Sequence, residues 1–343
     1  MSAPLFRWPT YLRTVVTAKC PLSCSYCHME GDPHERGAAW GLDAETLDRC
    51  LSVAVDAGIR KFKFLGGEPL ARRDLPERIA HLRRRAPDAD LSIITSGVGD
   101  LETVERLFAA GLSRMNVSIH GFSLDAFAKR SRLPGPQYEK RAAVLAFLMS
   151  LGRPLKLNFV YSGASDIDDL RALLSWSADR GVLVNVLDDL NDPTLGAGRL
   201  ATVLKDLRGP WVREYEESDP DSLPTTRLAW ADGLTVEIKT EQLGSVAPWQ
   251  DCARCPARAR CREGIYAVRL THLGRLQLCM DRADLGISLV EAVRQGHEPA
   301  VAAWRGFVTE HLRSGSAPLP AMSPTSVLNT PRHLPVISKG GAL

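Results

Sequence analysis

The stretch LRTVVTAKCPLSCSYC (residues 12–27) joins a run of β-branched residues to three closely spaced cysteines. The run LRTVVT predicts a strand, because β-branched residues favour extended backbone. Cys20, Cys24 and Cys27 follow with the spacing C-x3-C-x2-C, in a chain of 343 residues that has only eight cysteines. A strand followed at once by three thiols places those thiols at one end of a sheet.

The composition is that of an ordinary globular protein, with 45% hydrophobic and 24% charged residues. A formal net charge of +3 is too small for a nucleic-acid footprint, so we expect no nucleic-acid partner. No apolar run approaches the ~18 residues of a membrane span, and the N-terminus MSAPLFRWPT lacks the apolar region of a signal peptide. We therefore expect a cytoplasmic protein without a membrane partner, whose cysteines bind metal or do chemistry.

Short β-like runs alternate with helical patterns between residues 12 and 190. The runs predict six strands, at 12–17, 61–66, 91–96, 114–120, 155–160 and 183–188. The helical patterns lie near 43–57, 75–85, 101–110, 123–131 with 138–151, and 166–180. Strands joined by helices run parallel, because the helix returns the chain to the same end of the sheet. We predict a partial (β/α)6 TIM-like barrel with its working face at the carboxyl ends of the strands.

A second, smaller domain is expected after the barrel. The composition changes beyond residue 190 and predicts a linker around 191–225 with one short helix near 200–217. RLAWADGLTVEIKT (227–240) predicts a hairpin about Asp232-Gly233, and an amphipathic helix is expected over 289–313. These patterns divide the chain into a barrel over 1–225 and a C-terminal domain over 226–343.

Three thiolates suit a particular kind of iron–sulfur site. Each can bind one iron of a [4Fe–4S] cube, which leaves the fourth iron open to a small molecule. A zinc ion would need a fourth ligand, for which His28 and His34 are the nearby candidates. The spacing alone leaves both interpretations open.

Two further features narrow the choice. Tyr26 directly precedes the third cysteine, and Gly66-Gly67-Glu68-Pro69 follows the second predicted strand. With C-x3-C-x2-C after the first strand, the chain resembles the radical SAM superfamily. The resemblance implies that the open iron binds S-adenosylmethionine (SAM), and that one electron from a flavodoxin or ferredoxin cleaves SAM to methionine and a 5′-deoxyadenosyl radical.

The resemblance also implies roles for individual residues. The three cysteines would hold the catalytic cluster, and Tyr26 would pack against the adenine of SAM. The GGEP turn would offer backbone groups to the methionine ammonium, with its glycines permitting close approach. Ser118 would reach the ribose or carboxylate of SAM, although it could equally be an ordinary strand-end hydroxyl. The implied cofactor contacts are Tyr26, Gly66, Gly67, Glu68, Pro69, Ser96 and Ser118.

A second group of cysteines reads Cys252-x2-Cys255-x5-Cys261, followed by Gly274-x4-Cys279. Zinc-ribbon spacing is the alternative here, because C-x2-C paired with two distant cysteines is a common zinc pattern. The arrangement resembles the auxiliary-cluster domains called twitch and SPASM, which implies a second [4Fe–4S] cluster. Cys50 lies on the apolar face of a predicted helix, so we expect it in the core.

Segments over roughly residues 11–280 resemble the GTP 3′,8-cyclases of molybdenum cofactor biosynthesis, among them YLRTVVTAKC, FLGGEPLARRDLPE, AGLSRMNVSIHG, PLKLNFV and AVRLTHLGRLQLCM. Basic substrate contacts of that family would fall on Arg13, Lys156 and Arg269. Lys63 replaces an expected arginine, Ile94 an expected threonine and Ala267 one of two paired arginines. Alanine cannot bind phosphate, so these departures indicate a relative that kept the radical SAM motifs and changed its substrate.

The sequence therefore predicts a radical SAM enzyme that abstracts hydrogen from a small nucleoside, nucleotide or sugar-type substrate in specialised metabolism. Rearrangement, decarboxylation or oxidation of the substrate would follow. The alternatives are the GTP 3′,8-cyclase itself, a twitch-type peptide-modifying maturase and a zinc-binding structural protein. The candidates for anionic substrate groups are Arg13, Lys63, Lys156 and Arg269, each of which could instead form an ordinary surface ion pair.

Overall fold

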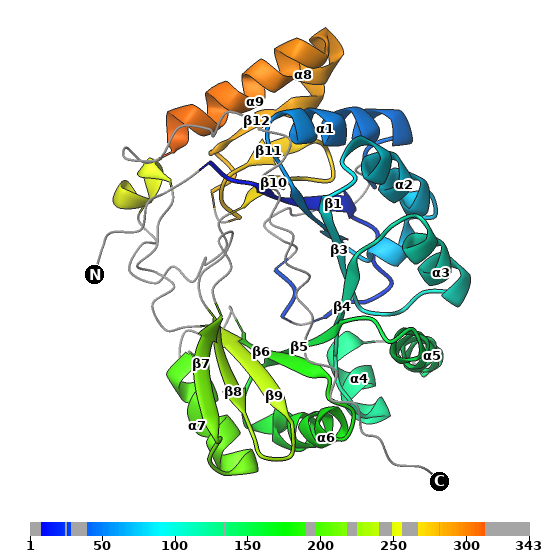
Figure 1. The fold of residues 1–343 in the computed structure, drawn as a ribbon, viewed down its shortest axis with the longest axis vertical. Coiled ribbons are helices and arrows are strands. Elements are labelled where there is room, and N and C mark those ends of the chain that lie inside the picture. Colours follow the sequence, from blue (N-terminus) through cyan, green and yellow to red (C-terminus); the bar gives the residue numbers. More distant parts are fainter. Residues whose placement is uncertain are drawn as a thin grey trace.

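The computed structural model describes residues 8–24, 26–28, 40–132, 135–189, 197–217, 225–239, 249–255, 267–280 and 282–312. Its strands form one 12-stranded sheet in the order β12-β11-β10-β1-β2-β3-β4-β5-β6-β9-β8-β7. The sheet curves round with helices along its outer side (Figure 1). The strands are β1 (Tyr11–Thr17), β2 (Lys61–Gly66), β3 (Asp90–Thr95), β4 (Arg114–Ser118), β5 (Leu155–Tyr161), β6 (Leu183–Asp188), β7 (Arg213–Glu217), β8 (Thr225–Ala229), β9 (Thr235–Lys239), β10 (Val268–Leu270), β11 (Arg275–Gln277) and β12 (Gly286–Ser288).

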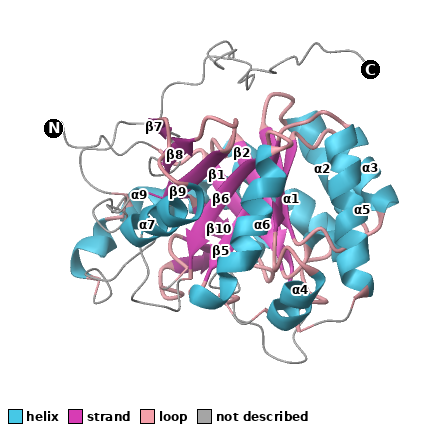
Figure 2. Ribbon diagram, turned by 90° about the horizontal axis from the view of Figure 1, so that it is seen from below, coloured by secondary structure: helices cyan, strands magenta, loops and turns pink. Residues whose placement is uncertain are grey.

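The helices between the first six strands have the predicted places, and several begin at side-chain caps. Asp43, Asp100 and Ser123 each accept a hydrogen bond from a backbone N–H in the first turn of the helix that follows. Figure 2 shows the helices packed along the sheet. The α-helices of the described residues are α1 (Ala44–Asp56), α2 (Leu75–Arg85), α3 (Leu101–Ala109), α4 (Leu124–Ser131), α5 (Pro136–Ser150), α6 (Ile167–Ala178), α7 (Ala197–Arg208), α8 (Leu289–Gln295) and α9 (His297–His311).

The predicted parallel barrel is confirmed, and its sheet has additional strands at both edges. Strands β1 to β6 are parallel neighbours, β10 adds to β1 in parallel, and β9 adds to β6 in parallel. Antiparallel strands β11 and β12 extend one edge, while β8 and β7 extend the other. The sheet therefore contains strands from both sides of residue 225. The division into domains at 1–225 and 226–343 stays a prediction.

Two local predictions were wrong. Residues 200–217 do not form one helix, because α7 ends at Arg208, Gly209 adopts a φ of +73° and β7 begins at Arg213. The helix expected over 289–313 is two helices, α8 and α9, separated by Gly296 with a φ of +133°. The hairpin about Asp232-Gly233 is confirmed by the antiparallel pair β8 and β9.

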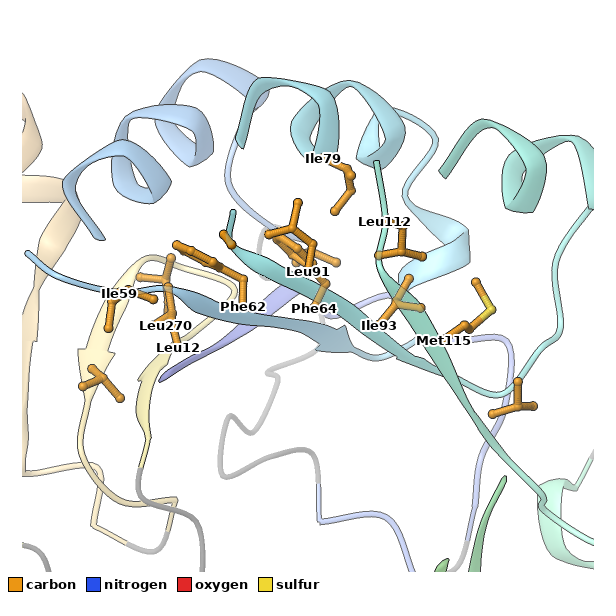
Figure 3. Packing of buried hydrophobic residues seen from close by; sticks show 14 of the residues in the cluster. Leu12, Ile59, Phe62, Phe64, Ile79, Leu91, Ile93, Leu112, Met115 and Leu270 are labelled. Carbon is orange, nitrogen blue, oxygen red and sulfur yellow. The ribbon is translucent and has the colours of Figure 1, made fainter. Parts of the chain in front are cut away.

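The two faces of the sheet differ in chemistry. Residues that point outward are apolar and pack against the helices, as the side chains of Leu12, Phe62, Phe64 and Ile93 do in Figure 3. Cys50 of α1 is fully buried in this layer, as predicted. Because successive strand residues point to opposite faces, Arg13 and Lys63, next to Leu12 and Phe62, lie on the concave face. No helix within the described residues is long and apolar enough to cross a membrane.

Candidate functional site

The carboxyl ends of β1 and β2 meet through the GGEP turn. The Gly67 N–H donates to the Thr17 carbonyl at 2.7 Å, and the Glu68 N–H donates to the Lys19 carbonyl at 2.8 Å. A Cβ on Gly66 would lie 2.4 Å from the Thr17 oxygen, and one on Gly67 would lie 2.4 Å from the Lys19 oxygen. In the structure, the close approach that these glycines permit is to the backbone that leads into the cysteine loop.

The Glu68 side chain then connects this turn to the end of β3. Its carboxylate is buried and accepts hydrogen bonds from Thr95 Oγ1 (2.6 Å), Ser96 N (2.8 Å), Ser96 Oγ (2.5 Å) and Leu70 N (3.0 Å). Burial raises the pKa of Glu68, although the four donors favour its ionised form. The Ser96 hydroxyl is thus bound to Glu68, while the predicted SAM contacts of Ser96 and of the GGEP turn, Pro69 included, stay predictions.

The three cysteines lie as free thiols in the loop after β1. Cys20 and Cys27 are exposed, and Cys24 is half-buried. Burial, followed by the neighbouring Cys20 and Cys27 thiols, raises the pKa of Cys24 to about 12. No three His, Cys, Asp or Glu side chains of the described ranges form a shell for a single metal ion. Three thiols in one loop, each free to bind a separate iron, fit a [4Fe–4S] cube.

Tyr26 packs against residues from the end of β4 and from α4. Its ring stacks on the imidazole of His120, with 5.7 Å between centroids and 16° between planes, and Arg130 lies 4.8 Å over the same ring. The Tyr26 hydroxyl contacts His120 Nδ1, and Cys24 Sγ lies 3.4 Å from that nitrogen. Burial lowers the pKa of His120 to about 3, so its ring is neutral near pH 7. The predicted adenine contact of Tyr26 stays a prediction.

Three of the four predicted substrate cations stand side by side on the concave face. Arg13 of β1 is in register with Arg269 of β10 on one side and with Lys63 of β2 on the other. Three neighbouring strands span about 10 Å, so these charges form a short row, which we call the cation row (Arg269, Arg13 and Lys63). The two arginines line a small recess together with Gln277. Both arginines are buried, and their role as substrate contacts stays a prediction.

Lys63 carries the clearest electrostatic signature of this row. Its pKa lies well below the usual value for lysine, first because of burial and then because of the nearby cations Arg114, Arg13, Lys61 and Lys156. Among the described residues, no carboxylate forms an ion pair with Lys63. An anion bound beside Lys63 would stabilise the charged form of this lysine.

Lys156 lies in a different setting from the cation row. Its Nζ forms a 2.5 Å ion pair with Glu237 of β9, whose other oxygen lies 3.3 Å from Arg227 of β8. A second register row passes through Glu237 and contains Ser118, Asn158, Asn185, Glu237 and Arg227. Asn185 Nδ2 donates to Asn158 Oδ1 at 3.0 Å, whereas Asn185 Oδ1 is buried without a hydrogen-bond partner. Ser118, Asn158 and Asn185 thus form a neutral polar wall beside the charged residues Glu237 and Arg227.

The second group of cysteines is described only in part. Cys252 lies in the 3-10 helix Gln250–Arg254, Cys255 follows it, and Cys279 follows β11, and all three are half-buried and outside any disulfide. Cys261 lies outside the described residues. Beside Cys255 lies Arg282, whose pKa is raised by Asp284 and by the Cys255 sulfur.

Several site residues were not predicted from the sequence. His120, Arg130, Asn185, Glu237 and Gln277 were not singled out, although each lies at a strand end, on a concave strand position or in a helix after a strand. The available signal was the period-2 alternation that assigns each strand residue to one face. What alternation does not give is the register between strands, and therefore the neighbour of each residue.

Comparison with known proteins identifies the superfamily. A model of the radical SAM superfamily matches residues 14–176. A GTP 3′,8-cyclase of Rhodococcus opacus is 31% identical over 315 residues, which cover 86% of this chain and 82% of that protein. This chain belongs to the radical SAM superfamily. A probable GTP 3′,8-cyclase of Methanococcus maripaludis is 27% identical and covers 83% of this chain and 90% of its own.

The fold of this radical SAM enzyme also recurs in solved structures. The crystal structure of Streptococcus suis SuiB bound to its precursor peptide SuiA has a TM-score of 0.59 and 14% identity, over 88% of this chain and 67% of SuiB. That identity shows a shared fold and no more. Membership of the superfamily implies a [4Fe–4S] cluster and SAM, for which Cys20, Cys24 and Cys27 are the fitting thiols.

Proposed function

We propose that this radical SAM enzyme acts on a nucleotide whose phosphate groups bind the cation row, and that its reaction is GTP 3′,8-cyclisation. The observation that carries the proposal is the register of Arg269, Arg13 and Lys63 across three adjacent strands of the concave face. Guanidinium groups bind phosphate oxygens in pairs, and the lysine adds a point charge. The relatives named GTP 3′,8-cyclase over most of the chain support the nucleotide.

The sequence alone favoured a relative with a changed substrate, and the comparisons favour the cyclase instead. When bound, the cluster and SAM supply a radical that abstracts hydrogen from the substrate. The protein's own residues then have three tasks. The cation row anchors the anionic end, the wall of Ser118, Asn158 and Asn185 offers neutral hydrogen-bonding groups, and Glu237 keeps Lys156 in place. The barrel wall excludes water from the radical.

The test is anaerobic incubation of the reconstituted protein with GTP, SAM and dithionite. Mass spectrometry should detect a cyclised nucleotide, together with 5′-deoxyadenosine in an amount that rises with GTP. A GTP-independent yield of 5′-deoxyadenosine with no nucleotide product would reject GTP as substrate, while leaving the radical SAM assignment intact.

A second candidate is the same radical chemistry on a smaller anionic nucleoside or sugar derivative. Ala267, which directly precedes β10 and is fully buried, stands where the resemblance to the cyclases implies a second arginine beside Arg269. The weaker grip on phosphate favours a substrate with a single anionic group. In the same assay, a nucleoside carrying one carboxylate would then stimulate 5′-deoxyadenosine formation more strongly than GTP does.

An auxiliary [4Fe–4S] cluster bound by Cys252, Cys255, Cys261 and Cys279 also belongs to this proposal. Support comes from the C-x2-C spacing of Cys252 and Cys255, from the half-buried side chains of Cys252, Cys255 and Cys279, and from the Arg282 guanidinium beside Cys255. Iron and sulfide analysis of anaerobically purified protein should give about eight irons per chain, and zinc without sulfide would contradict it.

Binding of GTP is expected to be coupled to proton uptake by Lys63 at alkaline pH. The pKa of Lys63 is low in the free protein, and an anion at the cation row would raise it, so a proton enters from solvent as the ligand binds. The nucleotide phosphates are already ionised at pH 8. Calorimetry in two buffers of different ionisation enthalpy measures this uptake. Lys63→Met should remove the buffer dependence, and a wild-type heat that is the same in both buffers would contradict the prediction.

A further inference from the structure

His120 reaches from the end of β4 to the cysteine loop. Its Nδ1 lies 3.4 Å from the sulfur of Cys24 and contacts the hydroxyl of Tyr26. The two rings are stacked, with 5.7 Å between their centroids. One ring nitrogen therefore faces both a thiol of the first cluster and the phenol two residues further along the same loop.

The segment that follows β4 holds the cysteine loop at further points. The Ser23 N–H donates to the Ser131 carbonyl at the end of α4, at 3.0 Å. Arg130 is buried, is ion-paired to Asp166 at 2.7 Å, donates to the Val160 carbonyl at 2.6 Å and lies over the Tyr26 ring. A backbone hydrogen bond, a cation–π contact and a ring stack thus fix the loop against α4 and His120.

The chemistry of Cys24 decides which form of His120 suits this contact. A thiolate that binds iron can only accept a hydrogen bond, so the contact is attractive only if His120 Nδ1 carries the proton. The Tyr26 oxygen can accept from the same N–H, because a phenol oxygen is an acceptor as well as a donor. The other tautomer would direct a nitrogen lone pair at the sulfur.

We propose that His120 is a positioning residue of the first cluster, whose Nδ1–H donates to the Cys24 sulfur and so raises the reduction potential of that cluster. Hydrogen bonds to cluster sulfurs favour the reduced form, because they stabilise its additional negative charge. The role concerns reduction of the enzyme and holds whichever substrate it takes. His120 tunes how readily the electron donor can load the cluster.

Three substitutions separate the donor from the rest of the side chain. His120→Asn can place an amide nitrogen near the position of Nδ1, His120→Gln places it near Nε2, and His120→Leu has no donor. The measurement is the midpoint potential of the EPR signal that changes when SAM is added to the full-length reconstituted protein. We expect His120→Asn to stay near the wild-type potential, and His120→Gln and His120→Leu to shift to more negative potentials.

Two controls accompany the series. Tyr26→Phe removes the competing acceptor and leaves the N–H to Cys24, so its potential should equal or exceed that of the wild type. His81→Leu removes a histidine that instead contacts Ser52 and Asp48, and should change nothing at the cluster.

Several outcomes would overturn the proposal. They are a wild-type potential in both His120→Gln and His120→Leu, a shift in His120→Asn as large as that in His120→Leu, or a more positive potential in His120→Leu. If a variant loses its cluster and has no EPR signal, its iron content is compared instead. Retention of iron by His120→Asn and its loss from His120→Leu would support the donor, whereas equal loss from both would contradict it.

Discussion

Replacement of Cys24 by alanine is expected to abolish reductive cleavage of SAM and to remove about four irons per chain. Cys20, Cys24 and Cys27 share one loop, and a cube that has lost one of three protein ligands is neither held nor oriented for SAM. The measurements are iron content, the EPR signal after dithionite reduction and the yield of 5′-deoxyadenosine.

Cys50→Ala is the matched control for this variant. Cys50 is a fully buried core thiol of α1, on the outer side of the sheet. Its loss should cost about 1 kcal/mol of stability and leave iron content and SAM cleavage unchanged. Formation of 5′-deoxyadenosine by Cys24→Ala at the wild-type level would show that the cysteine loop is not needed for cleavage of SAM.

Glu68→Ala should lower the free energy of unfolding by about 3 kcal/mol or more. The change would leave two hydroxyls and two backbone N–H groups without their acceptor in a buried place, each at a cost of about 1–3 kcal/mol before relaxation. The GGEP turn would also lose its connection to β3, so the affinity for SAM should fall together with the stability. Urea unfolding followed by circular dichroism gives the free energy.

Glu77→Ala provides the comparison for Glu68→Ala. Glu77 is an exposed residue of α2, ion-paired to Arg106, and its removal should cost less than about 1 kcal/mol. Equal stability losses in the two variants would show that the buried carboxylate of Glu68 does not connect the strand ends.

Much of the fold could be predicted from the sequence, because the six barrel strands are long and the helices between them are amphipathic. The parts that were missed are short or interrupted. Strands β10, β11 and β12 have three residues each, too few for a period-2 pattern to stand out. The break between α8 and α9 depends on Gly296, whose backbone leaves the helical region although the apolar period continues on both sides.

The site was predictable to the level of motifs and faces. The cysteines, the GGEP turn and the basic residues Arg13, Lys63, Lys156 and Arg269 were identified before their neighbours could be. Sequence could not show that Lys156 is paired with Glu237 while Lys63 is not paired with a carboxylate among the described residues, because strand register brings together residues far apart in the chain. The contact of His120 with Cys24 likewise joins residues 96 positions apart.

The cation row is tested most directly by the affinity of the SAM-loaded enzyme for GTP compared with guanosine, in the wild type and in Arg13→Met. The account predicts that the wild type binds GTP at least about 30-fold more tightly than guanosine, since a desolvated charge pair contributes about 2 kcal/mol or more. It also predicts that Arg13→Met loses most of this difference while its affinity for guanosine stays the same. Equal affinities for GTP and guanosine in the wild type, or an undiminished preference in Arg13→Met, would contradict it.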